Sequence, residues 1–244
     1  MRLLLVTTWL LIGAAITAGV YWSFLITPES SVISLLTSGL LLAATVLVAS
    51  FVVNGAIDIW SRGLSAAGLR RAVSSIASVI PAALIVAVMW WLTTRAEQWV
   101  AMRSGQIGAI FIARLGWDDI AWLFSAIRYA AIWLRWVIGG LLALSLMAAM
   151  LSAGWSALRR PAWLRRALRP RAIAASTVWF VALIAVPWMF LLPWRPDGLP
   201  PTSAEFAFIA VKLTVSALLL AIGTSLIIYE ATRSQATTVV AADS

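Results

Sequence analysis

Long apolar stretches alternate along the chain with short polar segments. A helix needs about 20 mainly apolar residues to cross a hydrocarbon core of about 30 Å, and six stretches reach that length. The pattern therefore predicts an all-α, polytopic transmembrane helix bundle that forms one integral membrane domain over residues 1–244. The six predicted spans cover residues 3–26, 32–60, 72–92, 132–155, 172–194 and 205–229.

The segment 95–131 does not fit this pattern, because charged and apolar residues are mixed along it. Trp99, Met102, Gln106 and Ile110 fall on one helical stripe, which is typical of a helix lying in the membrane interface. Glycines within the segment would also permit a break in the helix. We therefore expect an amphipathic or re-entrant helix on the outer face.

The composition strengthens the membrane assignment and excludes several chemistries. Hydrophobic residues make up 63% of the chain and charged residues 11%, with a mean hydropathy of +0.98, whereas soluble domains carry about 25% charged residues. The chain has no cysteine and no histidine. It therefore lacks the usual ligands of haem, zinc and iron–sulfur clusters and the usual proton shuttle. We expect no cofactor, no metal site and no enzymatic activity.

The formal net charge of +9 comes mainly from arginines that lie between the apolar stretches. This placement favours a role in membrane orientation and in contact with anionic lipids, and it does not favour nucleic-acid binding. Cytoplasmic loops of membrane proteins are enriched in basic residues. We therefore expect a multi-pass protein of the bacterial inner membrane with both termini in the cytoplasm.

The most distinctive motif is the basic inner loop at residues 158–171, with the sequence LRRPAWLRRALRPR. It can act as a topology signal that contacts anionic lipid, or as a short coupling helix that docks a cytoplasmic or membrane protein such as an ATPase. The six candidate contact residues are Arg159, Arg160, Arg165, Arg166, Arg169 and Arg171.

Ionisable residues within spans are rare and are candidates for function. Lys212 lies two helical turns after Glu205, and Arg135 lies two turns after Arg128. One hypothesis places Arg128, Arg135 and Lys212 in a basic outer pocket for phosphate or carboxylate, with Glu205 beside it. The alternative is that Lys212 reaches toward the interface along its own helix and that both arginines are interfacial.

Acidic residues suggest two further interactions. Asp58 lies one helical turn before Arg62, a spacing that predicts an ion pair within one helix. Asp118 and Asp119 follow Gly116 and are interpreted as N-capping residues, although a carboxylate pair could also serve acid–base chemistry.

Three resemblances concern small parts of the chain or its architecture. The stretch VKLTVSALLLAIG around Lys212 is similar to a late helix of copper-resistance-type membrane domains, but the expected metal-ligating residues are absent. A lysine in the last helix is similar to that of retinal proteins, but Phe208 occupies the position of their acidic residue. Six spans with a basic inner loop resemble ABC-type permease subunits.

These features predict a non-enzymatic membrane protein. The leading hypothesis is a permease-like or accessory subunit of a membrane complex that contacts an anionic or amphipathic molecule. The alternatives are a structural membrane subunit without a transport role, and a lipid-modifying enzyme that uses Asp118, Asp119 and nearby arginines.

Overall fold

The computed structural model describes residues 1–28, 31–116, 121–191 and 203–240, and every regular element within these ranges is helical. The α-helices are α1 (Arg2–Ile26), α2 (Val32–Arg62), α3 (Ala66–Ser74), α4 (Val79–Met102), α5 (Ser104–Leu115), α6 (Ala121–Trp133), α7 (Gly139–Ala153), α8 (Ala162–Ala167), α9 (Pro170–Phe180) and α10 (Ser203–Val240). The shorter elements are the 3-10 helices η1 (Ile76–Ser78) and η3 (Gly154–Arg159) and the π-helices η2 (Leu134–Ile138), η4 (Val181–Ala185) and η5 (Pro187–Leu191).

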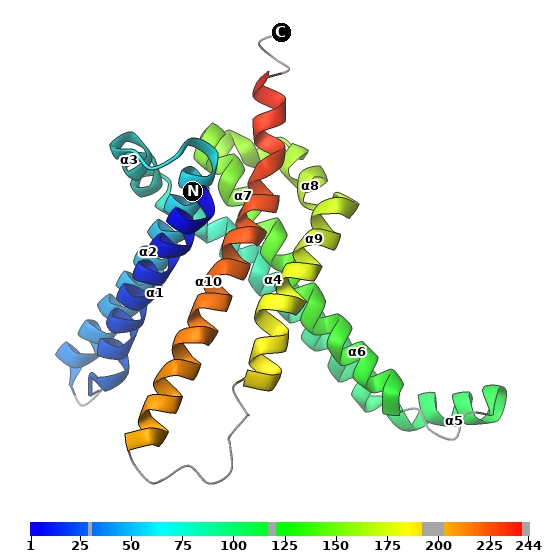
Figure 1. Cartoon of the computed structure of the whole chain (residues 1–244). Helices are drawn as coiled ribbons and strands as arrows, with labels where there is room; N and C mark the ends of the chain where they lie inside the picture. Colours follow the sequence, from blue (N-terminus) through cyan, green and yellow to red (C-terminus); the bar gives the residue numbers. More distant parts are fainter. Residues whose placement is uncertain (29–30, 117–120, 192–202, 241–244) are drawn as a thin grey trace.

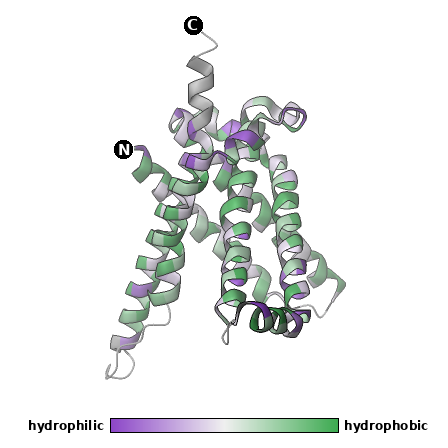
Figure 2. Cartoon of the chain, turned by 90° about the vertical axis from the view of Figure 1, so that its right-hand side faces the viewer, coloured by the Kyte–Doolittle hydropathy of each residue, from purple (hydrophilic) through white to green (hydrophobic). Residues whose placement is uncertain are grey.

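Six helical stretches are long and apolar enough to cross a membrane, so the all-α membrane bundle expected from the sequence is confirmed. They are Arg2–Ile26, Val32–Arg62, Ile76–Met102, Ala121–Arg159, Pro170–Leu191 and Glu205–Arg233. Hydrophobic residues fill the middle of the bundle, and hydrophilic residues gather toward its two ends (Figure 2). This banding is the one that a bilayer requires of a multi-pass protein.

The structure moves the boundaries around the predicted outer segment 95–131. α4 continues past Leu92 to Met102, α5 is a separate helix, and the fourth span already begins with α6. The charged residues Arg95 and Glu97 do not end α4, and Glu97 pairs with Arg135 on the next span. Asp118 and Asp119 lie outside the described residues, as does the predicted end of the fifth span at Trp194.

We call the end of the bundle that carries α3 and α8 the basic end. Figure 1 shows that α1 begins at this end and that α10 ends there, while α5 lies at the opposite end. Arg62, Arg70 and Arg71 belong to the helices at the basic end, together with the arginines around α8. Both ends of the described chain and its most arginine-rich segments therefore share one side.

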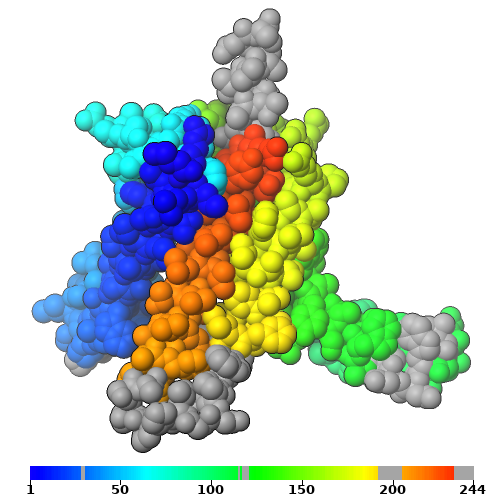
Figure 3. Space-filling model, in the orientation of Figure 1, coloured from blue at the N-terminus to red at the C-terminus, as the bar shows by residue number. Residues whose placement is uncertain are grey.

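The helices converge at the basic end and diverge toward the opposite end. α1 packs on α2, α9 on α10, and α4 on α6 and α7, and these groups form three arms in Figure 1. The space-filling view shows the α6 arm leaving α9 toward the opposite end (Figure 3). Most buried core residues lie where the arms meet, including Val6, Ala56, Met147 and Ile228. The tightly packed part of the protein is thus on the side of the basic end.

Small residues permit this close packing of the helices. An added Cβ at Gly13 would lie 2.4 Å from Val52, and one at Gly55 would lie 2.6 Å from Trp9. Small residues let helix backbones approach closely in membranes, where association depends on packing rather than on the hydrophobic effect. The Trp9 indole then donates a hydrogen bond to the Val52 carbonyl across this contact, at 2.8 Å. α1 and α2 consequently form one rigid arm.

Candidate functional site

A buried carboxylate joins α2 to the short helix α3. Asp58 is 2% exposed and accepts hydrogen bonds from two guanidinium groups. Arg71 donates through Nε to Oδ1 at 3.1 Å and through Nη2 to Oδ2 at 3.0 Å, and Arg62 donates through Nη1 to Oδ1 at 3.1 Å. The paired hydrogen bonds from Arg71 have the bidentate geometry that fixes a guanidinium most firmly on a carboxylate. We call these three residues the Asp58 cluster.

The local sequence shapes α3 to fit against Asp58. Ser65 caps α3 and accepts a hydrogen bond from the Gly68 amide at 3.0 Å. An added Cβ at Gly68 would lie 2.2 Å from Asp58 Oδ2, so only glycine leaves room for the carboxylate. Asn54, one turn before Asp58, donates from Nδ2 to the Ser75 carbonyl at 3.0 Å and so binds the chain just after α3. α3 is therefore held at both ends against α2.

The predicted ion pair between Asp58 and Arg62 is confirmed. The stronger partner, Arg71, was not predicted, because it lies 13 residues away and reaches Asp58 only through the turn between α2 and α3. The hydrogen bond to Asp58 raises the pKa of Arg71 above its usual value. Burial lowers this pKa and the negative charge of Asp58 raises it, and both effects are smaller than that of the hydrogen bond. The cluster carries two positive charges and one negative charge, which leaves it basic.

A second ion pair joins α4 to the fourth span on the side away from the basic end. Arg135 lies in the π-helical turn η2 and pairs with Glu97 of α4. Its Nε donates a hydrogen bond to Thr93 Oγ1 at 2.6 Å, and its Nη2 donates one to Thr94 Oγ1 at 3.2 Å. Its guanidinium also lies over the Trp90 ring, 4.8 Å from the ring centroid. The Arg135 side chain is 13% exposed, so most of its donors are used within the protein.

This pair is expected to stabilise the bundle as a unit. Arg135→Met should destabilise the protein, because it leaves the half-buried Glu97 carboxylate without its partner. The double variant Arg135→Met with Glu97→Gln should recover part of the loss, with a coupling free energy of about 1–2 kcal/mol. The measurement is the free energy of unfolding in a detergent titration of all four proteins of the cycle. Strictly additive single and double variants would contradict the interaction.

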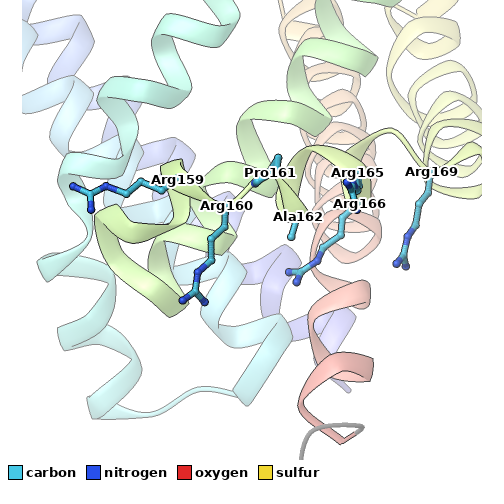
Figure 4. A pocket seen from close by; sticks show the side chains of 7 residues that line it. All are labelled: Arg159, Arg160, Pro161, Ala162, Arg165, Arg166 and Arg169. Atoms are coloured by element: carbon cyan, nitrogen blue, oxygen red, sulfur yellow. The ribbon is translucent and has the colours of Figure 1, made fainter.

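The arginine-rich segment around α8 forms a pocket of about 380 Å³. The α8 pocket, as we name it, is lined by Arg159, Arg160, Pro161, Ala162, Arg165, Arg166 and Arg169. Figure 4 shows Arg160, Arg166 and Arg169 extending toward the same side of the ribbon, while Arg159 points to the left, away from them. None of its five arginines forms an ion pair with a carboxylate of the described residues. The pocket thus concentrates unneutralised positive charge on one surface.

Apolar residues fix α8 to the bundle and leave its arginines outside. Ala167 is 1% exposed and packs with Val137 and Ile227. Trp163 is half-buried against a cluster that contains Leu146 and Met150. Leu164 and Leu168 stay partly exposed. This arrangement is typical of a segment that lies at a membrane interface with its charges directed toward water.

The remaining predicted site residues lie apart from the α8 pocket. Arg171 is exposed in the first turn of α9. Lys212 lies on α10 with its Nζ 5.6 Å from the centroid of the Phe208 ring, and Glu205 lies two turns earlier on the same helix. Arg128 is exposed on α6, and α9 lies between α6 and α10 in the view of Figure 1. The structure therefore brings Arg135 to Glu97, and the proposed grouping with Arg128 and Lys212 stays a prediction.

Within the described ranges, no three His, Cys, Asp or Glu side chains lie together as a metal site would require. Comparison of the chain with protein-family models, curated proteins and solved structures finds no match. The arrangement of its own residues is therefore the basis for assigning a function. The feature with the clearest chemistry is the α8 pocket, because its unpaired guanidinium groups are suited to bind carboxylates or phosphates.

Proposed function

We propose that the protein is a non-enzymatic, permease-like or accessory subunit of a membrane complex, and that it contacts an anionic molecule through the α8 pocket. The observation that supports this proposal is the set of five arginines around one pocket, none of them paired with a described carboxylate. Maintaining several cations close together is unfavourable unless water, salt or an anionic partner neutralises them. An acidic surface of a partner subunit supplies the negative charge that neutralises these arginines.

We also propose that the basic end faces the cytoplasm of a bacterium, with the protein in the inner membrane. The placement of α1's first turn, α10's last turn and the α8 pocket on one side supports this orientation. Basic residues near the ends of spans are retained on the cytoplasmic side during insertion. In this orientation the α8 pocket is accessible to a cytoplasmic subunit, and anionic lipids of the same leaflet surround it.

The test removes three positive charges from the α8 pocket. Arg165→Gln, Arg166→Gln and Arg169→Gln, combined in one variant, should release the partner subunit, because charge-assisted contacts are lost together. The measurement is the size of the complex on native gels after mild solubilisation of cross-linked membranes. Wild-type protein should migrate in a larger complex, and the triple variant as the isolated chain in equal amount.

A matched control removes three exposed arginines from the opposite end. Arg103→Gln, Arg114→Gln and Arg128→Gln change the net charge equally and should leave the complex intact. Raising ionic strength from about 0.1 M to 1 M shortens the screening length from about 10 Å to 3 Å and should mimic the α8 variant. A complex that survives both the triple substitution in the α8 pocket and high salt would point to a structural subunit held by its transmembrane faces. This result would contradict the proposed role of α8.

A further inference from the structure

A second pocket lies between α2 and α3, apart from the α8 pocket. It has a volume of about 350 Å³ and is lined by Phe51 of α2 and by Leu69, Arg70, Val73 and Ser74 of α3. Its walls are mainly aliphatic and aromatic, and Arg70 contributes the single charged side chain of the lining. We call it the α3 groove. An apolar groove with one cation suits an amphipathic anion.

The Asp58 cluster explains why this cation is available. Arg62 and Arg71 are both bound to Asp58, on the face of α3 that packs against α2. Arg70 precedes Arg71 by one residue and therefore points about 100° around the helix, away from Asp58. It is exposed and has no carboxylate partner among the described residues. Of the three arginines beside the turn, Arg70 alone makes no ion pair with Asp58.

The α3 groove lies beside the half of α2 that is nearer the basic end. Phe51 lies eleven residues before Arg62, the last residue of α2, which corresponds to about 16 Å along the helix. Half of a hydrocarbon core of about 30 Å has nearly the same thickness. Phe51 thus lies in the half of its span nearer the basic end, and α3, which forms the other wall of the groove, is not itself a membrane-spanning segment.

We propose that the α3 groove binds one anionic phospholipid from the leaflet at the basic end. An acyl chain lies along Phe51, Leu69 and Val73, and the lipid phosphate is bound by Arg70. The Ser74 hydroxyl already donates to the Arg71 carbonyl at 3.0 Å, so the guanidinium supplies the charge that selects the anion. The wall formed by α3 is pre-organised, because the Asp58 cluster holds it in place before lipid arrives.

The experiment counts bound lipid on the intact protein. Protein in neutral maltoside detergent is titrated with phosphatidylglycerol or with phosphatidylcholine of the same acyl chains, and native mass spectrometry gives the bound fraction. Wild-type protein should retain one phosphatidylglycerol in preference to phosphatidylcholine. Arg70→Gln should weaken phosphatidylglycerol binding about fivefold, the effect of one basic residue near an anionic surface. Val73 is half-exposed, and Val73→Trp should fill the groove and weaken binding of both lipids.

Two controls separate this site from general attraction to the basic end. Arg171→Gln removes an exposed arginine at the start of α9 that lines neither pocket, and it should leave phosphatidylglycerol binding unchanged. Glycerol 3-phosphate, which lacks acyl chains, should not compete. Unaltered binding in Arg70→Gln, an equal loss in Arg171→Gln, or full competition by glycerol 3-phosphate would overturn the proposal. Because the readout does not involve the α8 pocket, failure of its proposed role would leave these results unchanged.

Discussion

Gly68→Ala is expected to lower the free energy of unfolding by about 2 kcal/mol, although alanine is the better helix former. The methyl group would lie 2.2 Å from Asp58 Oδ2, so α3 must move away from α2 or Asp58 must leave its arginine partners. Overpacking of this kind costs about 1–3 kcal/mol, and the gain in helix propensity offsets at most about 1 kcal/mol of it. The free energy can be measured by unfolding in mixed micelles with increasing dodecyl sulfate.

The same substitution at another glycine provides the control. Gly39 lies in α2 with no atom within 4 Å of an added Cβ and faces the outside of the bundle. Gly39→Ala should leave stability unchanged or raise it by up to about 1 kcal/mol, since only helix propensity is altered. Opposite signs at the two positions would establish that Gly68 is required for space beside Asp58. Equal effects would remove the steric argument.

Asp58→Asn is expected to destabilise the protein by about 2 kcal/mol and to release α3. The substitution removes the negative charge between two arginines and places an amide donor opposite Arg71 Nη2, which is itself a donor. Breaking a fully buried ion pair costs about 3–5 kcal/mol. The loss expected here is smaller, about 2 kcal/mol, because Arg62 and Arg71 are 45% and 35% exposed and water can solvate them once Asp58 is neutral.

The chain has no cysteine, which permits a direct measurement of α3 release. Ala72 is fully buried against α2, so an Ala72→Cys thiol should react slowly with a water-soluble maleimide. Adding Asp58→Asn should increase the labelling rate, because α3 then separates from α2 more often. Arg71→Gln should increase it more than Arg62→Gln, since Arg71 is the residue that attaches α3. Equal labelling rates in all these backgrounds would contradict a latching role for the cluster.

The membrane architecture follows from local sequence alone. Insertion of a span depends on the summed transfer free energy of about 20 consecutive residues, and no tertiary contact is needed to read that sum. The six spans and the Asp58–Arg62 pair within one helix were therefore predictable. The uneven distribution of arginines between the loops is likewise a property of the linear sequence.

Tertiary structure decided which polar groups meet. Arg71 reaches Asp58 across a turn, and Arg135 reaches Glu97 across two spans, because the helix packing places these side chains opposite each other. Sequence spacing within one helix suggested instead that Arg135 acts with Arg128. Periodicity identifies the face of a helix on which a residue lies, but the neighbouring helix is chosen by small-residue contacts such as Gly13 with Val52. The different environments of the neighbours Arg70 and Arg71 likewise depend on the ion pair of Arg71 with Asp58, which only the folded chain shows.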